Sequence, residues 1–462
     1  MPEQDVSRLP VADLVAAYRD GSLSPVEVTK TFLDRIDRLD GELHAFVEVT
    51  RELALTQAAH AEAEYRNGGP VPPLLGVPVS IKDAFHVEGV VTTLGSLVHR
   101  GHVAKADSGV VRRLRESGAV FTGKTNTAEF GQSATTDNLL GPDTGNPWDP
   151  GRTPGGSSGG AAASVAAGLS TVAVGSDGGG SIRIPASFTG LFGLKPSPGL
   201  CPDERGFRAM TDFVSPGPLT TSVADARVML GVLADSRYDR QAPARLRIGY
   251  CARPEGRPVD PGVAKAVDSA AHAFESLGHE VVDIDLPIGD WNDVFGPLVL
   301  EDEHRERGHL LARPELLTRY ERSSLRAALA LDAEAVQLAR QSLPSFRARI
   351  DALFTSYDVL LTPTAAVPAF PLGERPTTID GREVDQLWGA FPFAVPFNVA
   401  GVPAASVPCG LLDGLPVGAQ LVARAGREQL LLDVAEQLEE AVSLDRSALV
   451  DRWSGTRAGA RT

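Results

Sequence analysis

Apolar residues first recur at helical spacing after a short polar segment near the N-terminus. Ser24-Pro-Val-Glu27 is a capping box with proline at the first helical position, so a helix is expected to begin here. The apolar residues on one face of this helix are Val28, Phe32, Ile36 and Leu39. The spacing therefore predicts an amphipathic helix that packs through this face.

Short apolar runs then alternate with helical stretches. In the first half of the chain, strands are expected at 77–81, 119–122 and 171–175, with helices near 108–117 and from Gly160. Later strands are expected at 246–251, 279–286, 358–361, 405–407 and 417–422, before a closing amphipathic helix at 428–442. This alternation predicts an α/β fold with a mixed, mostly parallel β-sheet core covered by α-helices.

The middle of the chain departs from this alternation. Residues from about 290 to 350 contain helical and highly charged runs, which indicate a helical cap on the sheet core. No linker rich in glycine, serine or proline separates independent domains, because the glycine-rich segments lie inside strand-helix units. We therefore expect a single large domain over residues 1–462, with the cap inside it.

Composition and charge exclude several classes of function. The chain has 44 Lys and Arg against 59 Asp and Glu, a formal charge of −15, so its surface repels polyanions and no nucleic acid is expected as partner. The small apolar stretch 161–175 is shorter than the roughly 20 residues that span a membrane, so it predicts a buried helix and strand. The acidic N-terminus lacks the pattern of a secretory signal, and cytoplasmic residence with no membrane contact is the expectation.

Cysteine and histidine positions do not suggest a metal site. The three cysteines lie far apart, in none of the spacings that bind zinc or frame disulfides, and are expected to be free thiols. The nine histidines include no HExxH motif and no pair at ligand spacing. No protein-bound metal is therefore predicted.

Two glycine-rich segments, 154–160 and 175–185, each place serine among residues without a side chain. Such a backbone can turn tightly and lets a substrate approach main-chain N–H groups, which suits an oxyanion hole. A flexible turn or a phosphate-binding loop is the simpler interpretation of an isolated glycine cluster. Neither segment matches GxxxxGK[ST] or a GxGxxG that opens a helix in the right context, so a nucleotide site is weakly supported.

A serine nucleophile needs a base, and no histidine motif accompanies these loops. Lysine can serve if burial lowers its pKa by roughly 3 units from about 10.4. Lys82 follows the apolar run 77–81, so it stands at the end of a strand where a lysine would be partly buried. Taken alone, Lys82 is more simply interpreted as a lysine that ends the strand and points to solvent.

Taken together, these segments resemble the amidase signature family. The motifs that carry the resemblance are Gly76-Val-Pro-Val-Ser-Ile-Lys82-Asp, Gly123-Lys-Thr-Asn126, Asn146-Pro-Trp-Asp149, Arg152-Thr-Pro-Gly-Gly-Ser-Ser-Gly-Gly160, Gly175-Ser-Asp-Gly-Gly-Gly-Ser-Ile-Arg183, Leu361-Thr-Pro363, Pro396-Phe-Asn398, Gly401-Val-Pro-Ala-Ala-Ser-Val-Pro408 and Gly414-Leu-Pro-Val-Gly-Ala-Gln420. They extend over nearly the whole chain. Only about residues 285–350 fall outside the resemblance, and there such enzymes are expected to vary with substrate.

The resemblance implies a catalytic role for three residues. Lys82 would be the base, Ser157 the proton relay that follows a cis peptide, and Ser181 the nucleophile that becomes acylated. The reaction it implies is cleavage of an amide-type C–N bond through an acyl-enzyme, with no cofactor.

The resemblance also implies an oxyanion hole and a set of supporting residues. The backbone N–H groups of Gly178, Gly179, Gly180 and Ser181 would form the oxyanion hole. Because Gly178 stands where the family often carries threonine or another side chain, the space beside the hole is expected to be looser or larger. The residues expected to support the loop or its hydrogen bonds are Ser158, Ser176, Asp177 and Arg183.

Substrate identity is less constrained than the reaction. Ile184, Trp388 and Phe391 suggest an apolar pocket, although aromatic residues in an α/β enzyme more often belong to the core. Linear amides, anilides, esters and carbamates, the last of which would make the enzyme a urethanase, all present a carbonyl group that this arrangement can attack. The expected ligand is therefore a small amide, ester or carbamate.

Two rival functions remain open from the sequence. The first is the glutamine-hydrolysing subunit of a tRNA-dependent amidotransferase complex; Ile184 speaks against it, because that subunit usually has glutamine at this position. The second is a catalytically silent binding protein on the same scaffold, which the presence of Lys82, Ser157 and Ser181 disfavours. The sequence does not fix the oligomeric state, and a homodimer stays open.

Overall fold

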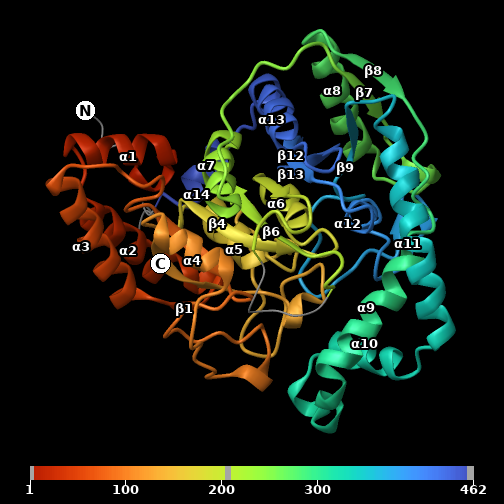
Figure 1. Ribbon diagram of the computed structural model, residues 1–462, viewed down its shortest axis with the longest axis horizontal. Helices are drawn as coiled ribbons and strands as arrows, with labels where there is room; N and C mark the ends of the chain where they lie inside the picture. Colours follow the sequence, from red (N-terminus) through yellow and green to blue (C-terminus); the bar gives the residue numbers. More distant parts are fainter. Residues whose placement is uncertain (1–4, 203–209, 455–462) are drawn as a thin grey trace, which may run out of the picture.

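One continuous eleven-stranded sheet runs through the protein, as the computed structural model of residues 5–202 and 210–454 shows (Figure 1). The strands of this sheet, in spatial order, are β1 (Phe46–Val49), β3 (Val120–Thr125), β2 (Pro78–Lys82), β4 (Val172–Asp177), β6 (Ser215–Thr220), β5 (Phe192–Lys195), β12 (Ala404–Leu412), β13 (Leu415–Ala423), β9 (Val359–Pro363), β7 (Arg247–Tyr250) and β8 (Glu280–Asp283). A separate hairpin joins β10 (Thr378–Ile379) to β11 (Arg382–Glu383). The described residues therefore form a single α/β domain, as predicted.

The sheet is mixed, but the prediction of mostly parallel pairing holds only in two blocks. β3, β2 and β4 are parallel to one another, and so are β9, β7 and β8. Between these blocks, the pairs from β4 through β6, β5, β12 and β13 to β9 are antiparallel, and β1 is antiparallel to β3 at the edge. The antiparallel centre arises because β12 and β13 form a hairpin and β6 is antiparallel to both of its neighbours, β4 and β5.

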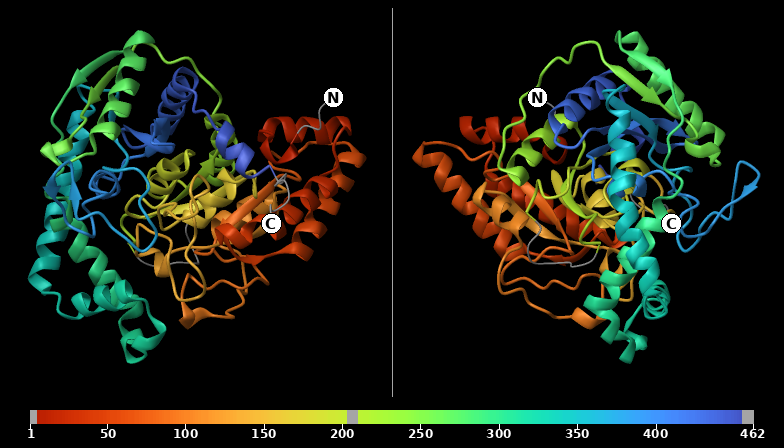
Figure 2. Two further views of the ribbon diagram at one scale, coloured as in Figure 1. Left: turned by 180° about the vertical axis from the view of Figure 1, so that it is seen from behind. Right: turned by 45° about the vertical axis from the view of Figure 1, so that its right-hand side comes forward.

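Helices cover the sheet on both faces (Figures 1 and 2). The α-helices are α1 (Val11–Asp20), α2 (Pro25–Leu43), α3 (Arg51–Asn67), α4 (Gly109–Glu116), α5 (Gly159–Ala166), α6 (Arg183–Thr189), α7 (Val223–Ala234), α8 (Pro261–Ser276), α9 (Trp291–Arg307), α10 (Arg319–Leu329), α11 (Ala333–Leu353), α12 (Val395–Val399), α13 (Glu428–Val442) and α14 (Ser447–Arg452). The short 3-10 helices are η1 (Val6–Arg8), η2 (Leu97–His99), η3 (Glu129–Gly131), η4 (Pro254–Gly256), η5 (Gly308–Ala312) and η6 (Pro314–Leu316).

Alternate residues of β4 show how the two layers are built. Val172 and Val174 pack into one core cluster with α7, α8 and α13, whereas Ala173 packs into another with α5. Successive side chains of a strand point to opposite faces, so these clusters lie on the two sides of the sheet. The small residues of α5 let that helix approach the sheet closely, which places its N-terminal end beside the ends of β2 and β4.

Several predicted elements are confirmed. The Ser24 side chain accepts a hydrogen bond from the Glu27 N–H at 3.2 Å and caps α2, and α13 covers the predicted residues 428–442. The charged middle of the chain forms α9, α10 and α11, which pack together at one end of the molecule (Figure 1). Among the described helices, none is long and apolar enough to cross a membrane.

Candidate active site

Lys82 is completely buried at the carboxyl end of β2. Its Nζ lies 2.7 Å from Ser157 Oγ and 2.9 Å from Ser176 Oγ, and it donates to the Ser176 carbonyl oxygen at 3.4 Å. β4 runs parallel to β2, so the carboxyl ends of both strands meet at the same edge of the sheet. The topology therefore brings the lysine to the loop that carries Ser176.

Ser157 lies in the tight loop that leads into α5. The peptide bond between Gly156 and Ser157 is cis. A side chain at Gly156 would place its Cβ 2.5 Å from the backbone of Thr135, so only glycine fits here. The next residue, Ser158, donates its N–H to the Ser181 carbonyl oxygen at 3.1 Å and its hydroxyl to the Ser176 carbonyl oxygen at 3.2 Å. Ser158 thus connects the loop of Ser157 to the loop of Ser181.

Ser181 lies in the turn between β4 and α6 and is partly exposed. Within the described residues, its hydroxyl makes no hydrogen bond, and neither do the N–H groups of Gly178, Gly179 and Ser181. Gly180 differs, because its N–H donates to Asp177 Oδ1 at 2.7 Å. The role of Gly180 as an oxyanion donor stays a prediction, and in this structure the Asp177 carboxylate accepts from its N–H.

A buried ion pair fixes this turn. Arg183 donates from Nε to Asp177 Oδ2 and from Nη2 to Asp177 Oδ1, both at 2.9 Å, with both side chains fully buried. Arg183 also donates to Gln420 Oε1 at 2.7 Å and to Asn398 Oδ1 at 2.5 Å. Asp177 accepts further hydrogen bonds from the N–H groups of Gly180 and Ile182. The network thus ties the turn to two segments from the C-terminal part of the chain.

Burial controls the charges at the site. Burial of Lys82 lowers its pKa to about 7, and the nearby Asp177 carboxylate opposes this shift. Burial alone would raise the pKa of Asp177, but the Arg183 guanidinium and its hydrogen bonds hold that pKa well below its usual value. At neutral pH a large share of Lys82 is therefore uncharged beside an ionised Asp177 that is already paired.

Replacing Arg183 by methionine is expected to lower the free energy of unfolding by about 3–5 kcal/mol, because it leaves the Asp177 carboxylate buried and unpaired. The measurement is urea denaturation of the wild type and the variant. Arg237→Met is the control, since Arg237 pairs with Asp239 in an exposed position and an exposed pair contributes about 1 kcal/mol at most. Equal losses in the two variants would contradict a structural role of the buried pair.

Two further lysines, Lys124 and Lys195, are also completely buried, and the sequence motifs indicated no role for them. Lys124 Nζ lies 2.6 Å from Asp83 Oδ1, and Lys195 Nζ donates to the Val402 carbonyl oxygen at 2.7 Å. Burial, together with repulsion by Arg183, lowers the pKa of Lys195 to about 7. The Lys195 amine donates to backbone carbonyl groups, whereas Lys82 contacts the hydroxyl of Ser157. Lys82 is thus the buried amine in a position to exchange a proton with a serine.

The structure separates the residues expected to line an apolar pocket. Ile184 and Phe391 are buried in one apolar cluster, where Phe391 packs with Phe188 and Phe370. Trp388 is only partly buried, and a side chain at Gly179 would place its Cβ 3.9 Å from it. Phe391 therefore belongs to the core, and Trp388 borders the loop of Ser181.

The space beside Gly178 is filled. A Cβ at Gly178 would lie 2.5 Å from Met210 Sδ. The predicted enlargement of the oxyanion region is therefore wrong, because the Met210 side chain occupies the volume that a larger residue at 178 would take. No sequence pattern indicated this contact, since Met210 lies outside the recognised motifs.

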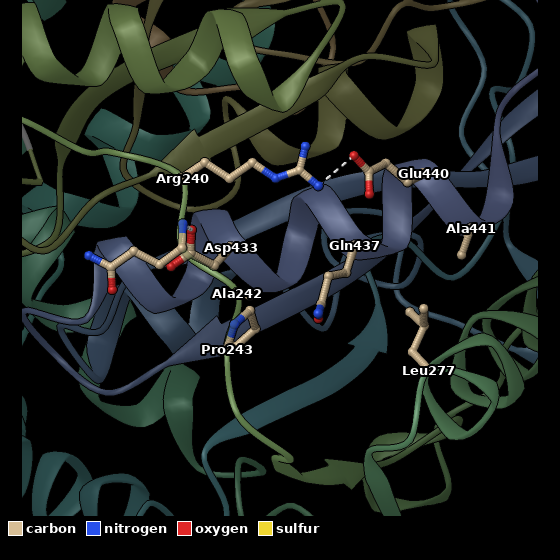
Figure 3. A pocket seen from close by; sticks show the side chains of 9 residues that line it. Arg240, Ala242, Pro243, Leu277, Asp433, Gln437, Glu440 and Ala441 are labelled. Atoms are coloured by element: carbon tan, nitrogen blue, oxygen red, sulfur yellow. Dashed lines mark hydrogen bonds and ion pairs between the residues drawn. The ribbon is translucent and has the colours of Figure 1, made fainter.

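Cavities occur both near this site and away from it. A polar cavity of about 580 Å³ has Thr135, which packs on Gly156, in its wall, together with Tyr320 and Arg375. A smaller one of about 340 Å³ lies between α13 and residues 240–243, where Arg240 and Glu440 form an ion pair (Figure 3). Its lining includes none of the site residues. In the part of the chain that the structure describes, no group of three metal-binding side chains could hold a metal ion.

Comparisons with known proteins agree with this arrangement. The family described as Amidase matches residues 27–432. The chain is 34% identical to a glutamyl-tRNA(Gln) amidotransferase subunit of Carboxydothermus hydrogenoformans over 94% of this chain and 97% of that protein, and 33% identical to an acylamidase of Rhodococcus erythropolis over 95% and 96%. The crystal structure of a bacterial aryl acylamidase of the amidase signature enzymes superposes with a TM-score of 0.89 at 28% identity, over 97% of this chain and 99% of that one.

The chain therefore belongs to the amidase signature family. It is a hydrolase of carbon–nitrogen bonds of the amide type.

Proposed function

We propose that the protein is an amidase that cleaves its substrate through an ester formed on Ser181, with Ser157 as relay and Lys82 as base. The observation that carries this proposal is the buried Lys82 Nζ 2.7 Å from Ser157 Oγ, with a pKa of about 7. An uncharged amine accepts a proton, and a relay hydroxyl passes one from the nucleophile.

Each step balances in protons. Ser181 Oγ bonds to the carbonyl carbon while its proton passes to Ser157, whose own proton passes to Lys82. Collapse of the tetrahedral intermediate breaks the C–N bond, and the same path returns the proton to the leaving nitrogen. Water then attacks the ester by the same path and releases the acid. The N–H groups of Gly178, Gly179 and Ser181, which have no acceptor among the described residues, are proposed to bind the oxyanion.

The rate is expected to depend on the ionisation of Lys82. Since burial lowers its pKa to about 7, kcat/KM should rise with pH up to about 7 and then level off, because only the uncharged amine accepts a proton. The measurement is a pH profile with an anilide that does not ionise between pH 5 and 9. A rate independent of pH from 5 to 8 would contradict Lys82 as the base.

A substrate panel tests the proposed activity. The purified chain is assayed with p-nitroanilides, primary amides, aryl esters and carbamates, and Ser181 is probed with a fluorophosphonate followed by peptide mass spectrometry. We expect turnover of at least one amide or anilide and labelling of Ser181. No turnover of any class, together with no labelling, would overturn the proposal. Turnover of carbamates in preference to amides would assign the enzyme as a urethanase.

A glutaminase subunit is the second candidate, because relatives at similar identity are named as subunits of glutamyl-tRNA(Gln) amidotransferase. Ile184 is buried among apolar side chains. It stands at the position where, by the family resemblance described above, that subunit usually has glutamine. We therefore favour the independent amidase. The test is glutaminase activity of the isolated chain before and after amidotransferase partner subunits are added: activity that depends on the partners would favour the subunit.

A further inference from the structure

The helical cap contributes aromatic side chains to the loop of the nucleophile. Phe295 of α9 is buried, and a Cβ built on Gly179 would lie 3.6 Å from its Cζ atom and 3.4 Å from Val395 Cγ2. The Trp388 ring borders the same glycine. An aromatic surface therefore stands at van der Waals distance from the middle of the loop 178–181.

These rings form one connected cluster. The centroids of Trp291 and Trp388 are 5.3 Å apart, those of Trp291 and Phe295 5.9 Å, and those of Phe295 and Trp388 6.0 Å, all in edge-to-face arrangements. Phe213 extends the cluster behind Phe295 at 5.2 Å. Edge-to-face pairs hold one another in fixed orientations, so the surface they present is rigid.

Exposure shows which side of the cluster faces solvent. In the loop 178–181, Gly179 and Ser181 are partly exposed, whereas Gly178 and Gly180 are buried. Trp388, like Gly179 and Ser181, is partly exposed, whereas Trp291 and Phe295 have only 2% and 3% of their surface exposed. The accessible part of this aromatic cluster therefore belongs to Trp388, which borders the partly exposed Gly179, two residues before Ser181.

The indole N–H of Trp291 distinguishes this cluster from ordinary core. Within the described residues it is buried and has no hydrogen-bond acceptor. The other two buried indoles are satisfied: Trp148 Nε1 donates to the Thr189 carbonyl oxygen and Trp453 Nε1 to the Pro147 carbonyl oxygen, each at 2.9 Å. Buried indole N–H groups usually find a partner, so Trp291 is the exception among these three indoles, and its contacts in the cluster are the rings of Phe295 and Trp388.

We propose that Trp388, backed by Phe295 and Trp291, forms a substrate-binding wall that selects amides with a flat aromatic group next to the scissile bond. This inference rests on the proposed function and names the substrate class of the same site. It also gives the helical segment that contains α9 a role in specificity.

The test compares substrates that differ only in the group next to the bond. One series keeps methylamine as leaving group and changes the acyl group from cyclohexanecarbonyl to benzoyl; the other keeps acetyl and changes the amine from 2,2,2-trifluoroethylamine to aniline, two amines of similar basicity. In the wild type we expect kcat/KM to be at least about tenfold higher for the aromatic member of at least one series, as an apolar contact surface of this size provides. The series that responds shows which side of the bond meets the wall.

Trp388→Leu is expected to lower this aromatic preference about tenfold. Phe295→Leu, which removes the ring that backs Trp388, is expected to lower the preference as well. Phe274→Leu is the matched control, because Phe274 is a buried phenylalanine of α8 that packs on His279, and it should leave the preference unchanged. Trp388 is partly exposed, so its variant keeps the test valid if Phe295→Leu fails to fold. An unchanged preference in the Trp388 variant with retained activity would overturn the inference.

Measuring the binding of amides to an inactive variant tests the wall independently of the proposed catalytic mechanism. The Ser181→Ala variant is titrated with benzamide and with acetamide, with and without Trp388→Leu. Tighter binding of benzamide that is lost with Trp388→Leu supports the wall even if the wild type hydrolyses no member of the panel. Equal binding of the two amides overturns the wall and leaves the proposed catalytic residues to be judged by the labelling of Ser181.

Discussion

Ser181→Ala is expected to lower kcat at least about 10⁴-fold on any amide that the wild type hydrolyses, because no other group can form the ester intermediate. The fold should persist, since the Ser181 hydroxyl makes no hydrogen bond within the described residues. The measurement combines steady-state hydrolysis with circular dichroism. Residual activity then reflects binding and the oxyanion hole alone.

Ser164→Ala provides the matched control for this variant. Ser164 is a fully buried serine of α5 whose hydroxyl donates to the Ala161 carbonyl oxygen and lies 3.0 Å from Ser80 Oγ. Among the described residues, this hydroxyl makes no hydrogen bond to Lys82, Ser157 or Ser181. Its activity should stay close to that of the wild type. If Ser181→Ala and Ser164→Ala kept similar activity, Ser181 would not be the nucleophile.

Lys82→Met is expected to lower kcat about 10³-fold or more and, at the same time, to stabilise the fold at neutral and acidic pH. The wild type must bury an amine whose pKa falls from 10.5 to about 7, which costs roughly 5 kcal/mol when the solution is more acidic than both values. Methionine fills the same space without that cost. Assays of hydrolysis and of thermal unfolding on the same preparation measure both effects.

The pH dependence of this stabilisation has a defined sign. The unfolded chain binds a proton on Lys82 up to about pH 10.5 and the folded chain only up to about pH 7, so wild-type stability increases with pH between these values. The advantage of Lys82→Met should therefore be largest below pH 7 and shrink toward pH 10.5.

Lys124→Met is the control, and it is expected to change the free energy of unfolding in the opposite direction. Lys124 pairs with Asp83 at 2.6 Å, so its removal leaves a buried carboxylate unpaired and should destabilise the fold by about 3–5 kcal/mol. If Lys82→Met destabilised the protein to the same extent below pH 7, Lys82 would be buried as a charged group, and its role as an uncharged base would be excluded.

Local sequence patterns predicted the elements that carry the site, because the residues that define each helix start or strand are adjacent in the sequence. The capping box defined the start of α2, and the apolar run 77–81 placed Lys82 at the end of β2. Pairing direction was harder to predict. β6 contains Pro216 and Pro218 yet lies between β4 and β5 in the sheet, although proline without an N–H normally argues against an interior strand.

The finer chemistry of the site depends on contacts between residues distant in sequence. The sequence indicated an N–H donor at Gly180, but not that Asp177 accepts from it. It assigned Ser176 to bracing the loop, whereas the Ser176 hydroxyl contacts Lys82 itself at 2.9 Å. It also suggested a pocket role for Phe391, because aromatic residues of core and pocket look alike until the fold separates them.

The anchoring of Arg183 has a consequence for biosynthesis. Its guanidinium is held by the Ala394 carbonyl oxygen, Asn398 and Gln420, which lie 211 to 237 residues further along the chain. A nascent polypeptide on the ribosome already contains Lys82, Ser157 and Ser181 long before these partners are translated. Until then, the turn after β4 lacks these contacts, so the proposed nucleophile is expected to be held in place only when residues 394–420 have emerged and folded.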